Sequence, residues 1–219
     1  MMGVTQLCRD EIKNYDDSNS RYRLGNNDIY DFVKKHFSNK NIDWIANKMW
    51  LIGRTYAAAV ERFKKDEILK EDDFYYDHVA PFIADSELDN KINAIKKKGY
   101  KSPLDVGASE DILDLHMYLV NLLKELTNQE KRSLASKYLH FHLPSLVFIY
   151  DHITASNINK FIKKGTIKIP QHIGHGWDNE YAKLYYKAME IYEIVSKNKY
   201  PSGDCFIRVV DNLLLRYKK

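Results

Sequence analysis

Cysteine is scarce in this sequence, with only Cys8 and Cys205 among 219 residues, near opposite ends of the chain. Such a pair makes neither a disulfide framework nor a CxxC metal site, so we interpret both as reduced thiols. Long hydrophobic runs are also lacking. No segment approaches the roughly 20 apolar residues that span a bilayer, and the N-terminus has no signal-peptide core. We therefore expect a cytoplasmic protein without a membrane-spanning segment.

Several catalytic motifs are absent as well. The chain has no P-loop, no G-x-G-x-x-G and no G-x-S-x-G, so nothing supports nucleotide hydrolysis or serine-hydrolase chemistry. H-E-x-x-H is absent, and the histidines at 140, 142, 152, 172 and 175 lack a diagnostic zinc spacing. We expect neither a metal nor another cofactor.

The composition is that of an ordinary folded protein, with 44% hydrophobic and 29% charged residues. Intrinsic disorder would need lower hydrophobicity and a larger net charge. The formal charge of +4 permits an anionic partner such as DNA without requiring one.

Helical spacing recurs along the whole chain and predicts an all-α fold. We expect one compact domain over residues 1–219 with about nine or ten helices, either in one body or in two lobes with a cleft between them. Residues 147–150 and 166–169 are β-prone, but fragments of this length cannot build a sheet-based domain.

Residues 41–63 carry the strongest apolar pattern and predict a buried central helix. Gly53 and Ala57 lie four residues apart, which predicts a close helix crossing. Arg54, Glu61 and Arg62 are charged in this apolar setting. Either they form structural ion pairs, or an arginine lines a cleft and binds an anionic substrate.

A polar stripe follows the helix predicted to end near His142. Ser133, Ser136, Lys137 and His140 recur at spacings of three and four residues, opposite an apolar ridge. The stripe is either a solvated face or the wall of a cleft that holds a phosphate or an acidic substrate.

Asp151 follows the apolar run Leu146–Tyr150 and is the most distinctive candidate. A carboxylate at the end of a buried run is poorly solvated, which prepares it as a general base. Asp151 is equally suited to be the N-cap of the helix that follows, and the two roles are compatible. His152, beside it, is a candidate for substrate binding.

Residues 133–155 contain the pattern A-S-K-Y-L-H-F…P…F-I-Y-D-x-x-x-A. This pattern resembles the later part of helix-hairpin-helix DNA glycosylases, in which a loop with a proline leads to an essential Asp that begins the next helix. The resemblance implies that Asp151 is the catalytic carboxylate and that Lys131 matches the lysine of bifunctional members. The chain departs from the family at residues 126–130, which read L-T-N-Q-E in place of a glycine-rich hairpin.

Two functional hypotheses follow. The first is a DNA-binding, glycosylase-like protein with Asp151 in a cleft beside Lys137 and His140. The second is a non-catalytic helical interaction or accessory protein in which Asp151 is a cap and Arg54–Glu61 is structural.

Overall fold

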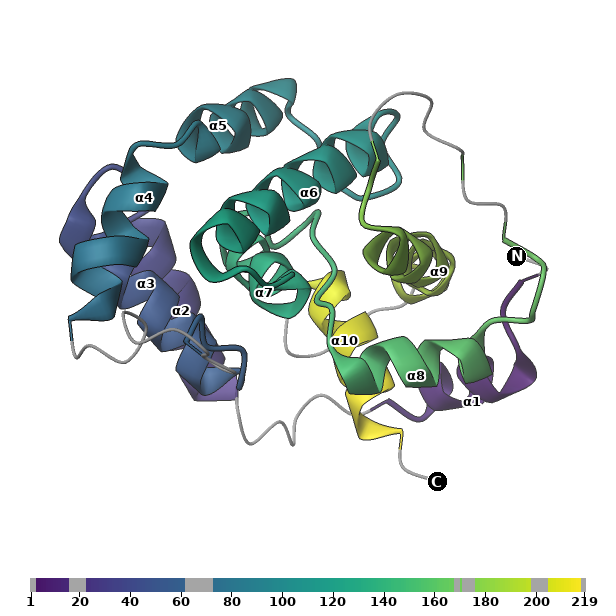
Figure 1. Cartoon of the computed structure of the whole chain (residues 1–219). Coiled ribbons are helices and arrows are strands. Elements are labelled where there is room, and N and C mark those ends of the chain that lie inside the picture. Colours follow the sequence, from purple (N-terminus) through teal and green to yellow (C-terminus); the bar gives the residue numbers. More distant parts are fainter. Residues whose placement is uncertain are drawn as a thin grey trace.

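Helices make up nearly all the regular structure in the computed structural model of the chain (Figure 1). The structure describes residues 3–15, 23–61, 73–167, 170, 176–197 and 205–217. Within these residues the predicted all-α fold is confirmed, with ten α-helices and one π-helical turn, η2. The elements are α1 (Gln6–Lys13), α2 (Arg23–Lys35), α3 (Ile42–Thr55), η2 (Tyr75–Val79), α4 (Ala80–Ala84), α5 (Leu88–Lys98), α6 (Ala108–Thr127), α7 (Arg132–His142), α8 (His152–Phe161), α9 (Asn179–Val195) and α10 (Phe206–Arg216).

Two groups of helices lie on either side of α6 and α7 (Figure 1). The first group contains α2, α3, η2 and α4, of which α2 and α3 pack against α7. The second contains α1, α8, α9 and α10, and its helix α9 packs against α6. Buried apolar side chains from every helix belong to one continuous core.

The most deeply buried helix is α7, in which every residue from Leu134 to His142 is buried. The prediction of a buried central helix over residues 41–63 is wrong in its burial and in its length. Helix α3 packs against α2, η2, α4 and α7, but it ends at Thr55 and is buried on one face only, because Trp50 on the other face is 50% exposed. A strongly apolar sequence therefore marks a partly exposed helix here, and a mixed sequence marks the most deeply buried one.

The chain reverses direction just after α3. Ala57 adopts a left-handed conformation (φ 51°), and the Ala58 N–H donates to the Gly53 carbonyl at 2.7 Å. A Cβ added to Gly53 would lie 3.0 Å from the Cα of Ala59. Gly53 thus makes room for residues 58 and 59, where the chain folds back onto α3, rather than for the predicted crossing with another helix.

Some helices begin or end at residues that favour such positions, and others do not. Gly99 ends α5 in the left-handed conformation (φ 71°), and Asp151 caps α8, as the sequence indicates. Thr127 and Glu130 have the spacing of a capping box, but Thr127 is the last residue of α6 and its hydroxyl donates to the Leu123 carbonyl. Ser109 is a residue type that favours the N-cap, but it lies inside α6, which begins after Gly107.

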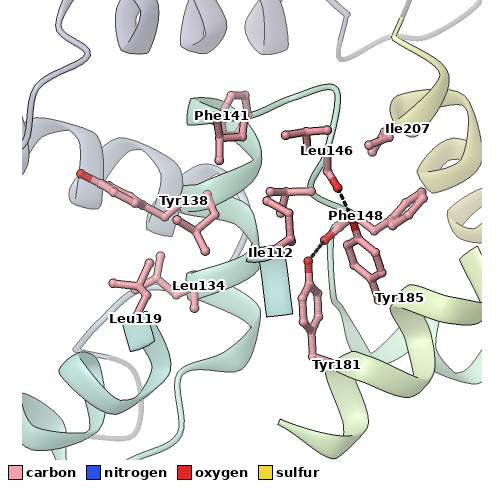
Figure 2. Close-up of a cluster of buried hydrophobic side chains, with 14 of the residues drawn as sticks. Ile112, Leu119, Leu134, Tyr138, Phe141, Leu146, Phe148, Tyr181, Tyr185 and Ile207 are labelled. Carbon is pink, nitrogen blue, oxygen red and sulfur yellow. Dashed lines mark hydrogen bonds between the residues drawn. The ribbon is translucent and has the colours of Figure 1, made fainter. Parts of the chain in front are cut away.

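An extended segment joins α7 to α8 through the core without belonging to a sheet. The Tyr185 hydroxyl donates to the Leu146 carbonyl at 2.8 Å, and the Tyr181 hydroxyl donates to the Phe148 carbonyl at 2.9 Å (Figure 2). Side chains thus satisfy backbone groups that would otherwise need a neighbouring strand. This explains the β-prone sequence at 147–150; the other β-prone fragment, at 166–169, lies partly outside the described residues.

Candidate functional site

Asp151 stands where the extended segment ends and α8 begins. Its Oδ1 accepts hydrogen bonds from the backbone N–H groups of Ile153 (2.7 Å) and Thr154 (3.2 Å). The Thr154 hydroxyl is 3.0 Å from the Asp151 N–H and completes a capping box. The cap fixes one carboxylate oxygen at the positive end of the helix dipole.

The second oxygen, Oδ2, is directed toward Lys137 of α7. The Lys137 Nζ lies 3.9 Å from Oδ2, at the limit of an ion pair, and also donates to the Ser133 hydroxyl at 2.9 Å and to the Tyr56 carbonyl at 3.2 Å. The Lys137 side chain is only 4% exposed, while that of Asp151 is 27% exposed. The carboxylate is therefore held in place by its surroundings and still accessible.

A cavity of about 430 Å³ opens at this point between the two groups of helices. The turn at residues 57–59 after α3 lines one side, and the start of α7 lines another. Residues 150–153 line a third. A volume of this size is typical of small-molecule and cofactor pockets.

Three of the predicted site residues share this cavity with Asp151, namely Lys131, Lys137 and His152. Lys131 is the N-cap of α7, and its Nζ donates to the Gln129 side-chain carbonyl at 2.8 Å. His152 is an exposed side chain at the first position of α8. The fold therefore gathers residues that lie 20 positions apart in the chain.

His140 does not line the Asp151 cavity, contrary to the hypothesis that it binds substrate there. It is fully buried, its Nδ1 is 2.8 Å from the Val147 carbonyl, and its Nε2 is 2.5 Å from the Tyr30 hydroxyl. A carbonyl only accepts, so Nδ1 carries the proton and Nε2 accepts from Tyr30. Burial lowers the pKa of His140 to about 3, which keeps the ring neutral.

The polar stripe of α7 is buried at Ser136, Lys137 and His140 and half-buried at Ser133, rather than forming a solvated face. Ser136 is fully buried, and its hydroxyl accepts the Tyr150 N–H at 2.9 Å. On the side facing α3, His142 accepts from Lys48 at 3.3 Å through Nε2 because its Nδ1 donates to the Tyr138 carbonyl. Burial lowers the pKa of Lys48 to about 7. The stripe ties α7 to its neighbours, and Ser133 and Lys137 are the members of it that reach the cavity.

Arg54 and Glu61 form the predicted ion pair, but not along one helix face. The chain reversal after Thr55 brings Glu61 back to Arg54, and the Tyr75 hydroxyl donates to the same carboxylate. Arg54 lines an adjacent cavity on the other side of the 57–59 turn, apart from Asp151. Arg62 lies outside the described residues.

A buried arginine and its partner lie behind the site on α10. The Arg208 guanidinium donates to Asp211 Oδ2 at 2.8 Å, and both side chains are at most 10% exposed. Burial raises the pKa of the Asp211 carboxyl, the neighbouring Arg208 opposes this, and Asp151 adds to it. This pair was not singled out in the sequence, because only the packing of α10 against α8 brings it near Asp151.

Metal binding gains no support from the described part of the chain, which holds no group of three or more histidine, cysteine or acidic side chains suited to a metal ion. His172 and His175 lie outside the described residues. No helix among the described residues is long and apolar enough to cross a membrane.

The site thus offers an oriented carboxylate, two amines and an imidazole around an open cavity. Tyr56 and Ser133 complete it; Ser133 belongs to the predicted polar stripe, whereas Tyr56 was missed as a site residue. Their contribution arises from the reversal after α3 and from the first turn of α7, neither of which leaves a motif. No model of a known protein family matches the chain, and no curated protein or solved structure matches it either.

Proposed function

We propose that the chain binds DNA and releases a base from it, with Asp151 as the catalytic carboxylate. The observation that carries this proposal is that Asp151, the cap of α8, shares one cavity with Lys131 at the start of α7. These are the two residues that the resemblance to helix-hairpin-helix DNA glycosylases implies for catalysis.

The chemistry needs a carboxylate in a fixed position and a nucleophile. A water oxygen adds to C1′ of the sugar while the N-glycosidic bond breaks, and the base leaves with the bonding electron pair. Asp151 takes a proton from the water, and solvent supplies a proton to the departing base. Its Oδ1 is fixed by the cap, which leaves Oδ2 to face the reacting sugar. In the covalent form of the reaction, the Lys131 amine takes the place of the water.

The turn between α6 and α7 also supports the proposal. Asn128 is left-handed there (φ 54°), a conformation that Asn adopts more readily than most residues other than glycine. Asn128 thus supplies a backbone shape for which the glycosylase family uses glycine. Lys131 adds positive charge beside the turn, as a phosphate-binding surface requires.

The test uses duplex oligonucleotides that each carry one modified base, such as uracil, hypoxanthine, 8-oxoguanine or an alkylated adenine. Base release is read as strand cleavage after alkali, and binding is measured across a salt series. We expect binding to weaken steeply with salt, because phosphate contacts displace counterions. Absence of binding at low salt would remove the proposal.

Two substitutions separate catalysis from capping. Asp151→Asn keeps an oxygen that can accept the cap hydrogen bonds, whereas Asp151→Ala removes the cap and lowers stability by about 1 kcal/mol. We expect both variants to bind DNA and to lose base release by at least about a hundredfold. If Asp151→Asn is as active as the parent protein, Asp151 is not catalytic.

One observation favours the non-catalytic alternative. Trp50 of α3 is 50% exposed and Tyr76 of η2 is 42% exposed, and both line a groove of about 310 Å³. Exposed aromatic side chains of this kind are enriched at protein interfaces. If Trp50→Ala abolishes binding of a protein partner, and neither this variant nor the parent chain releases a base from DNA, the result favours an interaction protein.

A further inference from the structure

A second cavity, of about 450 Å³, lies where α2, α5, α7 and the start of α10 meet. Phe141 and His142 of α7 line it, whereas Leu134 and Lys137 of the same helix line the Asp151 cavity. None of the residues that the structure describes lines both cavities. The two sites are therefore distinct, although one helix supports them.

Three cations converge on this second cavity from three helices, Lys34 from α2, Lys96 from α5 and Arg208 from α10. Neither lysine forms an ion pair with a described residue; the Lys96 ammonium lies 3.7 Å from the centre of the Phe37 ring. Arg208 is held in place by Asp211, at 2.8 Å, and its planar guanidinium suits phosphate. Asp31 is the one carboxylate among the described residues that line the cavity.

The remainder of the lining selects among anions. Tyr30, Phe37 and Phe141 present aromatic rings, with those of Tyr30 and Phe141 4.7 Å apart. Asn27 and Asp31 on α2 add hydrogen-bond acceptors. Aromatic rings favour a flat apolar group, and acceptors beside cations favour a ligand that carries donors as well as negative charge.

We propose that this cavity binds a nucleoside phosphate. The phosphate lies among Lys34, Lys96 and Arg208, the base lies against the aromatic rings, and Asp31 accepts from a ribose hydroxyl or a base amino group. The same chemistry is offered by a free nucleotide and by the terminal nucleotide of a nucleic acid strand. The proposal does not depend on base release at Asp151.

The test is isothermal titration calorimetry of the full chain with nucleoside monophosphates, inorganic phosphate and a single-stranded oligonucleotide with a 5′-phosphate. The double variant Lys34→Gln/Lys96→Gln removes two lining charges. Its matched control, Lys35→Gln/Lys97→Gln, removes two adjacent exposed charges that do not line the cavity. All four lysines are exposed, so both variants are expected to fold, which thermal unfolding checks.

We expect a monophosphate to bind and the lining variant to bind it at least about tenfold more weakly, while the control stays within about twofold. Asp151→Asn should leave this binding unchanged. If only the oligonucleotide binds, with the same dependence on Lys34 and Lys96, the natural ligand is a strand end. Equal loss in both double variants, binding of inorganic phosphate as tight as that of the nucleotide, or no binding of either nucleotide form would overturn the proposal.

Discussion

Helices α3 and α7 exchange the roles that their sequences suggest. Helix α3 is apolar on nearly every side, yet one of its faces lies at the surface with Trp44 and Trp50 exposed. Helix α7 carries serine, lysine and two histidines, yet it is buried from Leu134 onward. Polar side chains can occupy a core when each has a partner, because the cost of burial is the cost of an unmade hydrogen bond.

The partners of α7 come from elsewhere in the chain. His140 bonds to Tyr30 of α2, and Ser136 bonds to the backbone of the extended segment. The apolar surface of α3, by contrast, exceeds what its neighbours cover. Composition alone thus gives the wrong order of burial for these two helices, and the predictions below test this comparison.

The largest expected effect is the pH dependence of stability. Burial lowers the pKa of His140 and His142 to about 3 and that of His116, on α6, to about 4. Unfolded histidine titrates near pH 6.5, so from there downward the unfolded chain binds protons that the folded chain does not. The contribution of these histidines to stability is full above that pH and falls, as the pH is lowered, by about 1.4 kcal/mol per pH unit for each histidine, or about 4 kcal/mol per pH unit for all three.

Urea denaturation at several pH values between 6.5 and 5 measures this slope, and His140→Leu should remove about one third of it. Lys48 of α3 affects stability in a separate pH range, above that of the histidines. Its pKa is lowered by burial from 10.5 to about 7, so its effect is a rise of stability with pH above 7. A flat profile below pH 6.5 would show that the histidines of α7 are not buried in the neutral form.

The next prediction compares a polar-to-apolar substitution on α7 with an apolar-to-polar substitution on α3. His140→Leu makes α7 more apolar but leaves the Tyr30 hydroxyl and the Val147 carbonyl without their partner, at about 3 kcal/mol. Trp50→Gln makes α3 more polar and should cost only about 1 kcal/mol, since half of Trp50 is already in water. Free energies of unfolding in urea give both values, and the reverse order would break the comparison.

A smaller effect is expected from two polar truncations. Ser136→Ala removes the buried hydroxyl that accepts the half-buried Tyr150 N–H and should cost about 1–2 kcal/mol. Asn47→Ala on α3 removes hydrogen bonds to the Asp43 carbonyl and the Tyr76 hydroxyl at the surface, where water replaces them. We expect a change below about 0.5 kcal/mol for Asn47→Ala. Thermal unfolding compares the two, and equal losses would contradict the assigned burial.

The smallest effect concerns the turn that ends α3. Ala57 has φ 51°, so Ala57→Gly should relieve strain and raise stability by about 0.5–1 kcal/mol. Gly53→Ala should lower stability, because its Cβ would meet the Ala59 backbone at 3.0 Å. Stability changes of opposite sign for these two variants, measured by thermal unfolding, would support the chain reversal after Thr55. A continuous helix would be stabilised by Gly53→Ala instead.

Local physical chemistry made part of the fold predictable. The helices around residues 109–126 and 181–195 follow from apolar spacing, and the positions of Gly99 and Asp151 follow from terminal backbone requirements. Part of the candidate site was predictable from local sequence as well. Asp151 is recognisable as a cap after a buried run, whereas the approach of Tyr56 and Lys137 needs the chain reversal after α3.

The sequence by itself therefore determined the helical class, most helix positions and the capping role of Asp151, because these depend on residues a few positions apart. The tertiary structure alone decided which helix is central, which polar groups are buried, and that Asp151 opens into a cavity shared with Lys131. These properties depend on partners far away in the chain, such as Tyr30 for His140 across 110 residues. No local pattern records such partners, because each of them is set by how the helices pack.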